Sequence, residues 1–234
     1  MSTPEAKDKA FIKRTIWIIV IITVLQAVVG LIVYPMIPEQ IPVHWGIDGQ
    51  VNRYGDKWMI FQSPMISALL LLYFIIAPKI DPFAKNFGKM HKAYGITTIV
   101  VALIMLITFI VMVLAAFDIS VSATNIITAA IGIMFIFIGN YLPQAKRNFF
   151  MGIRLPWTLL NDEVWAKTHR FGGIVFVIVG FLFLLGMIFP VPYNVWVPIG
   201  GCFLMLPILI AYSFMTYKKV VKSDPTEENI TQED

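Results

Sequence analysis

Six long apolar segments, separated by loops of alternating charge, constrain this chain more than any other feature. Most of them reach the length of about 20 residues that an apolar helix needs to cross a hydrocarbon core of about 30 Å. The sequence therefore predicts an all-α polytopic membrane protein with six transmembrane helices, and the segments cover residues 16–34, 58–76, 96–117, 123–141, 173–189 and 195–217.

The distribution of Lys and Arg predicts which side of the membrane each loop faces. Sixteen of the 18 basic residues precede the first segment, follow the sixth, or lie in the second and fourth loops. Only Arg53 and Lys57 lie in the odd-numbered loops. Because cytoplasmic loops of membrane proteins are enriched in Lys and Arg, we expect a multi-pass protein of the cell membrane with both termini in the cytoplasm.

This topology divides the chain into regions and limits its partners. The composition, 58% hydrophobic and 14% charged, leaves no room for a large soluble domain. The net charge of +4 follows from the topology, so we expect no direct nucleic-acid partner. The predicted regions are a cytoplasmic N-terminus (1–15), a helix pair with external loop 35–57 and cytoplasmic loop 77–95 (16–95), a four-helix region with cytoplasmic loop 142–172 (96–217), and a polar cytoplasmic tail (218–234).

The positions of the ionisable residues argue against several functions. All of them lie in loops or at segment ends, whereas proton relays and ion pumps need charged groups at membrane depth. A small-molecule or lipid carrier remains an alternative, because Pro64 and Pro207 predict broken helices whose carbonyls could bind a substrate. The chain has no GxSxG motif and no nucleophile with a companion base, so we expect no enzyme activity. Its three histidines lack metal-ligand spacing, and neither a metal nor another cofactor is expected.

The external loop has a pattern of its own. Ile41, Val43 and Trp45 alternate with other residues, which predicts a short extended stretch at the membrane surface. The run 48–50 (Asp-Gly-Gln) then predicts a turn, and a polar cluster at 52–56 follows it.

The cytoplasmic loop 142–172 is long and contains two prolines, which exclude one continuous helix. Asn161 can cap a helix that follows it, and Lys167 and Arg170 would suit its last turn. Because Val164, Trp165 and Thr168 would share one side, we expect a short helix lying on the inner leaflet.

A polar cluster marks the cytoplasmic end of the fourth segment. It consists of Asn140, Arg147, Asn148 and Arg154. Guanidinium groups bind phosphate and carboxylate in pairs of hydrogen bonds, so one interpretation is a docking or anionic-headgroup site. The other interpretation is loop architecture, in which Arg154 donates to backbone carbonyls. The sequence leaves both open.

One region of the chain resembles a known family. The residues 139–173, GNYLPQAKRNFFMGIRLPWTLLNDEVWAKTHRFGG, are similar to the signature of the SdpI family of membrane immunity proteins. The external loop, with IPVH at 41–44 and YG at 54–55, resembles the family's N-terminal region, as does PKIDP at 78–82. The resemblance covers nearly the whole membrane region but not the tail.

The resemblance implies protection against a secreted membrane-active peptide, the sporulation-delaying toxin of Bacillus-like bacteria, by binding rather than cleavage. It also implies a signalling role, in which the toxin-engaged protein holds a transcriptional repressor at the membrane. The predicted partners are therefore a peptide toxin, membrane lipids and an ArsR-type repressor. Candidate toxin-binding residues are His44, Trp45, Arg53 and Tyr54; candidate residues for docking a regulator or a lipid headgroup are Asn140, Arg147, Asn148, Arg154, Trp157, Lys167, His169 and Arg170.

Overall fold

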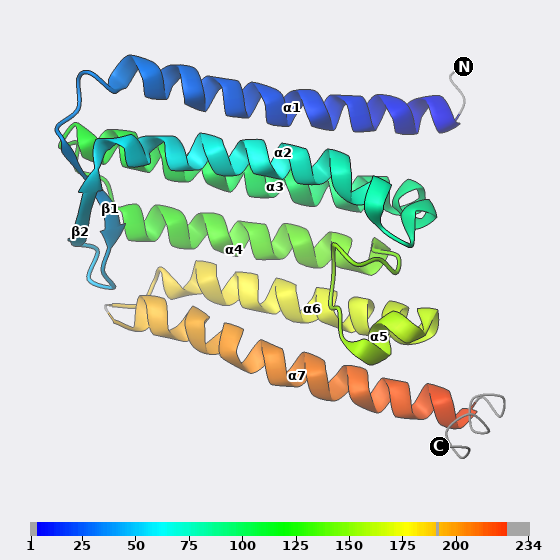
Figure 1. Cartoon of the computed structure of the whole chain (residues 1–234). Coiled ribbons are helices and arrows are strands. Elements are labelled where there is room, and N and C mark those ends of the chain that lie inside the picture. Colours follow the sequence, from blue (N-terminus) through cyan, green and yellow to red (C-terminus); the bar gives the residue numbers. More distant parts are fainter. Residues whose placement is uncertain (1–3, 191, 224–234) are drawn as a thin grey trace.

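The computed structural model describes residues 4–190 and 192–223, and it consists almost entirely of helices lying side by side (Figure 1). Six of the described helices are long and apolar enough to cross a membrane, which confirms the predicted fold class and a multi-pass membrane protein. They are α1 (Pro4–Val33), α2 (Gln62–Ile80), α3 (Ala84–Ala116), α4 (Ala123–Tyr141), α6 (Asp162–Gly186) and α7 (Tyr193–Ser223), with the short α5 (Pro156–Leu160) before α6.

Several helices begin earlier or end later than the sequence predicted. Residues 4–15 form the first turns of α1, and most of the expected loop 77–95 belongs to α2 and α3. The helical geometry of α3 is interrupted at Met90, where φ is −120° and ψ is 16°. Lys and Arg are good helix formers, so a charged end does not terminate a helix. The tail is helical as far as Ser223, and the rest of it lies outside the described residues.

The prolines do not divide α2 or α7 into separate helices. Pro64 lies in the first turn of α2, where a missing backbone N–H costs no intrahelical hydrogen bond. Pro207 lies inside α7, which nevertheless forms one helix from Tyr193 to Ser223. The broken helices on which the carrier alternative relied are therefore absent from the described residues.

The two halves of the bundle pack by different means. In the first half, α1, α2 and α3 meet through large side chains, including the stacked rings of Phe74 and Tyr94. In the second half, α4 and α6 meet along a seam of glycines. A Cβ added at Gly139 would lie 2.6 Å from the Gly173 carbonyl oxygen, and one added at Gly180 would lie 2.6 Å from that of Gly132. Small residues at this spacing let two membrane helices approach backbone to backbone.

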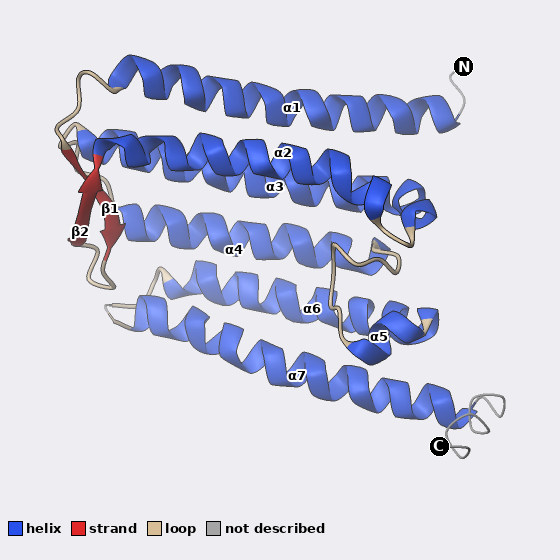
Figure 2. Ribbon diagram, viewed as in Figure 1, coloured by secondary structure: helices blue, strands red, loops and turns tan. Residues whose placement is uncertain are grey.

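A β-hairpin covers the end of the bundle opposite the termini (Figure 2). Its antiparallel strands are β1 (Gln40–Trp45), as predicted, and β2 (Val51–Asp56). The sequence did not predict β2, because the polar run 52–56 lacks the alternation of a strand. The turn expected at 48–50 is present, with Gly49 at φ +80°. Ile41 and the fully buried Ile60, just after β2, pack with Phe109 of α3, so the base of the hairpin is fixed to the bundle.

Candidate functional site

A cleft of about 870 Å³ lies beneath the hairpin, between it and the ends of α3, α4 and α7. This volume is within the usual range of about 300–1,000 Å³ for ligand pockets. We call it the hairpin cleft. Its lining residues from the hairpin include His44, Trp45, Asp48 and Asn52, and those from the bundle include Thr108, Thr124, Ile127, Thr128, Pro192 and Val195.

Hydrogen bonds fix the shape of the cleft. His44 Nδ1 lies 2.6 Å from Asn52 Oδ1, a cross-strand contact in which the ring donates to the amide oxygen. Thr124 at the start of α4 donates to the Gly46 carbonyl over 3.3 Å and so attaches the hairpin tip to the second half of the bundle. Asp48 accepts from the backbone of Gln50 at 3.1 Å. The cleft thus combines an indole, an imidazole and a carboxylate with aliphatic walls, a surface suited to a peptide.

The predicted toxin-binding residues divide into two groups. His44 and Trp45 line the cleft, whereas Arg53 and Tyr54 lie on β2, are exposed, and are outside its lining. Sequence reasoning missed the helix residues of the site. Thr124 and Thr128 carried a usable signal, because two hydroxyls four residues apart in an apolar segment share one helix face.

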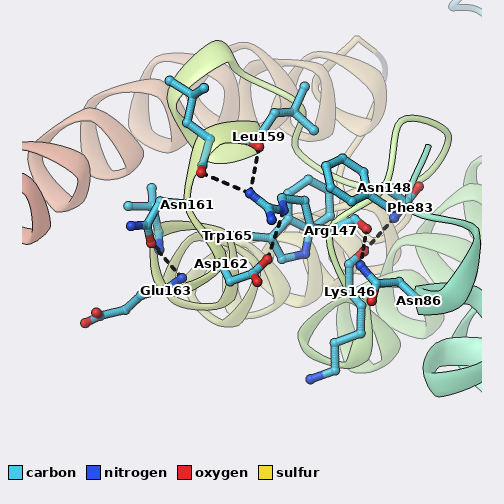
Figure 3. Close-up of polar contacts among 12 residues, drawn as sticks. Phe83, Asn86, Lys146, Arg147, Asn148, Leu159, Asn161, Asp162, Glu163 and Trp165 are labelled. Atoms are coloured by element: carbon cyan, nitrogen blue, oxygen red, sulfur yellow. Dashed lines mark hydrogen bonds and ion pairs between the residues drawn. The ribbon is translucent and has the colours of Figure 1, made fainter. Parts of the chain in front are cut away.

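The loop of residues 142–172, which the charge distribution predicts to be cytoplasmic and which we call the cytoplasmic loop, folds against the opposite end of the bundle and is held there by polar contacts. The buried carboxylate of Asp81 accepts from the backbone N–H of Phe83 at 2.6 Å and of Phe149 at 2.7 Å. Asn86 of α3 donates to the Arg147 carbonyl at 2.7 Å, a contact visible in Figure 3. The loop is therefore joined to the α2–α3 connection.

Arg147 uses its guanidinium group within the protein (Figure 3). Nη1 donates to the carbonyl oxygens of Leu159 at 3.1 Å and Leu160 at 2.9 Å, at the end of α5. Nε forms an ion pair of 2.9 Å with Asp162, and the group lies 4.6 Å from the centre of the Phe83 ring. This side chain joins α5, α6 and the α2–α3 connection.

Asn148 and Arg154 are also architectural. The fully buried Asn148 amide donates to the carbonyls of Lys146 and Met151, and its oxygen accepts from the N–H groups of Phe150 and Met151, all within 2.6–2.9 Å. Arg154 donates to the Phe149 carbonyl. Of the two interpretations of this cluster, loop architecture describes Arg147, Asn148 and Arg154.

The expected helix on the leaflet surface is the start of α6 instead. Asn161 caps it as predicted, accepting from Glu163 N and Val164 N. The helix continues across the membrane to Gly186, so Lys167 and Arg170 are not in its last turn. Trp165 and Thr168 are buried within the protein instead of lying against lipid, and Trp165 Nε1 donates to the Ala145 carbonyl at 2.9 Å.

His169 and Trp157 take part in the same internal packing. His169 Nδ1 donates to the Trp165 carbonyl at 2.8 Å, and Nε2 accepts from Ile153 N at 2.9 Å, so the buried ring is neutral. Its neighbour across the loop, Gly152, has φ +117°. Trp157 Nε1 donates to Ser213 Oγ at 3.0 Å and attaches α5 to α7.

The other cytoplasmic candidates remain at the surface. Exposed Lys167 forms an ion pair of 2.6 Å with Glu163 one turn earlier. Asn140 and Arg170 line a groove of about 390 Å³ between α4 and α6, which continues along Ile174 and Ile178. A partner that approached this end of the bundle would therefore meet these residues rather than Arg147 or Asn148.

The fold defines a multi-pass helical membrane protein, and similarity to a known bacterial protein supports the bacterial cell membrane as its location. Residues 144–214 match the SdpI/YfhL protein family, which confirms the resemblance to the SdpI family, and residues 21–68 match a domain of unknown function, DUF1648. The chain is 28% identical over 201 residues to the Immunity protein SdpI of Bacillus subtilis (strain 168), covering 86% of this chain and 95% of that protein. No solved structure matches the chain.

Proposed function

We propose that this protein is an immunity protein that protects a bacterial cell from a secreted, membrane-active peptide by binding it in the hairpin cleft. The carrying observation is the cleft itself, about 870 Å³ in volume, with an indole, an imidazole and a carboxylate at its edge. The relative named as an immunity protein supports the biological role. The positive-inside distribution predicts that this end of the bundle faces outward, where a secreted peptide arrives.

Protection by binding needs no catalytic group. Apolar peptide side chains would contact Trp45 and the aliphatic wall, and peptide N–H groups would meet the Asp48 carboxylate. Sequestered in the cleft, the peptide no longer inserts into the bilayer. The protein acts in this proposal as a stoichiometric binder, so protection rises with its abundance.

The direct test is expression in a strain sensitive to the sporulation-delaying toxin. Wild-type protein should restore growth, and Trp45→Ala with Thr128→Val should reduce protection at equal membrane abundance. Arg53→Ala and Tyr54→Ala are matched variants, because both residues are exposed on the same hairpin but outside the cleft lining. Unchanged killing with wild-type protein would overturn the proposal for that toxin. If Arg53→Ala and Tyr54→Ala reduce protection more than the cleft variants do, the binding surface is the exposed face of β2 instead of the cleft.

A second candidate function is a signalling receptor that holds an ArsR-type repressor at the membrane. One observation favours it: Asn140 and Arg170 remain exposed on the cytoplasmic loop side while their neighbours are used internally. Fractionation of a co-expressed repressor tests this. We expect toxin-dependent membrane association that Arg170→Gln abolishes and Lys85→Gln leaves intact, and a repressor that stays soluble in toxin-treated cells contradicts it.

A further inference from the structure

A second cavity lies at the opposite end of the bundle from the hairpin, among α1, α2 and α3. It has a volume of about 480 Å³, and we call it the α1–α3 groove. Lys79 and His91 are at its polar edge, and the rest of its lining is aliphatic, aromatic, Pro or Gly. The wall is formed by Ile12 and Ile16 of α1, by Phe74, Ile75 and Pro78 of α2, and by Ala84, Phe87, Gly88 and Tyr94 of α3.

Gly88 gives the groove its width. A Cβ added at this position meets no atom within 4 Å, in contrast to the seam glycines, whose added Cβ atoms collide with backbone. A helix with Gly at an interior position is less stable than one with Ala by about 1 kcal/mol. Because no neighbouring atom requires a glycine at position 88, its effect is to leave open space beside the helix. His91 Nδ1 donates to the Gly88 carbonyl at 2.9 Å, next to the interruption at Met90.

A basic cavity adjoins this apolar groove. Its volume is about 460 Å³, it shares His91 with the groove, and its lining includes Lys7, Arg14 and Lys92 against one acid, Asp8. Asp8 Oδ1 lies 3.2 Å from His91 Nε2 and offsets part of that charge. Lys79, in the last turn of α2, is exposed at the groove edge. Basic pockets between transmembrane helices are typical binding sites for anionic lipid headgroups.

We propose that the α1–α3 groove is a binding site for an anionic phospholipid. One acyl chain lies along Phe74, Ile75 and Phe87, and the phosphate contacts Lys79 and the basic residues beside His91. Apolar walls meet the chain and cations meet the headgroup, an arrangement that matches an amphiphile at the membrane boundary. The site lies at the other end of the bundle from the hairpin cleft and does not depend on the proposed immunity function.

The test uses the full chain purified in detergent, with phosphatidylglycerol and phosphatidylcholine as probes. Native mass spectrometry counts the retained lipids, and thermal unfolding measures their stabilisation. Wild-type protein should retain phosphatidylglycerol in preference to phosphatidylcholine. Gly88→Phe fills the groove and should remove this retention, whereas Gly88→Ala should preserve it, since its methyl group enters open space.

Charge is tested separately from space. Lys79→Gln should weaken phosphatidylglycerol binding about fivefold, which corresponds to about 1 kcal/mol for one Lys near an anionic surface, and leave phosphatidylcholine unchanged. Lys85→Gln is the matched control, because Lys85 is exposed on nearby α3 but does not line the groove.

Three results would overturn the proposal. The first is equal retention of both lipids by wild-type protein, and the second is equal lipid retention by Gly88→Phe and Gly88→Ala. The third is displacement of phosphatidylglycerol by a stoichiometric amount of toxin peptide, which would make the peptide the occupant of the groove. Lipid-free thermal unfolding checks the fold, and a Gly88→Phe variant that unfolds early is replaced by Ile75→Trp, which fills the same groove from α2.

Discussion

The hairpin and the cytoplasmic loop are the two long connections of this protein, and their polar residues differ in how far they are exposed. In the cytoplasmic loop, Arg147, Asn148 and His169 form hydrogen bonds with the protein's own backbone. In the hairpin, His44 and Asp48 are exposed at the edge of a cleft. The loop with the more specific family signature is therefore the more structural one. A distinctive motif can record the requirements of folding instead of those of binding.

Two glycines provide the most direct comparison of the loops. Gly152 has φ +117° and Gly49 has φ +80°, so both have a backbone conformation that favours glycine. Their surroundings differ. A Cβ at Gly152 would lie 2.2 Å from His169 Nε2, whereas the nearest atom to one at Gly49 is Thr124 Oγ1 at 3.9 Å.

The largest effect is therefore expected from Gly152→Ala. The new methyl group displaces the His169 ring and strains the backbone, so the free energy of unfolding should fall by about 3 kcal/mol or more. Gly49→Ala strains the backbone alone and should cost about 1–2 kcal/mol. Thermal unfolding of the two variants in the same detergent measures the difference, and equal losses would contradict the contrast between the loops.

The second prediction concerns Asn148. Replacing it with Leu leaves the buried N–H group of Met151 and the part-buried N–H group of Phe150 without their acceptor, and a buried unsatisfied group costs about 1–3 kcal/mol. Chemical unfolding in detergent should show a large loss of stability and a low membrane yield. Asn140→Leu serves as the control, since that amide bonds to the Ile136 carbonyl of its own helix at an exposed position. A small effect at Asn148 would mean that the loop tolerates rearrangement.

A smaller loss of stability is expected when the hydrogen bond between α5 and α7 is removed. Trp157→Phe retains ring packing against Phe214 but removes the hydrogen bond to Ser213. The expected cost is about 1 kcal/mol, because Ser213 still donates to the Ile210 carbonyl. Limited proteolysis would detect weaker attachment of α5 as faster cleavage of the cytoplasmic loop. An unchanged cleavage rate would show that the indole N–H does not hold α5 against α7.

The smallest effect on stability, within about 0.5 kcal/mol, is expected from Asn52→Ala in the hairpin, where the partner His44 is exposed to solvent. The same change removes a polar group from the cleft and should reduce protection against toxin. Growth assays on cells that express the variant, and unfolding of the same variant purified in detergent, separate the loss of protection from the loss of stability. Protection that falls only as far as stability falls would indicate that the hairpin, too, is structural.

Local patterns predicted much of this fold, because apolar length, the alternation at 41–45 and the cap at Asn161 depend on neighbouring residues. Sequence could not assign the roles of Arg147 and Asn148, since a guanidinium or an amide can serve a ligand or a distant carbonyl equally well. Their partners, such as the Leu159 carbonyl, become adjacent only when α5 folds back. His44 and Trp45 could be chosen from the hairpin's own sequence, whereas Thr124 and Thr128 join them in the cleft only through the tertiary fold.

The glycine seam has a mechanical consequence. Backbone contact at Gly132 with Gly180, and at Gly139 with Gly173, holds α4 directly against α6, and the rings of Phe135 and Phe183 stack beside this seam. We expect the pair to move as a stiff rod, because one end is bonded to the hairpin through Thr124 and the other end continues into the cytoplasmic loop. We therefore expect a ligand that displaces the hairpin to tilt this pair of helices as a whole, so that the opposite end of the bundle moves without any change in secondary structure.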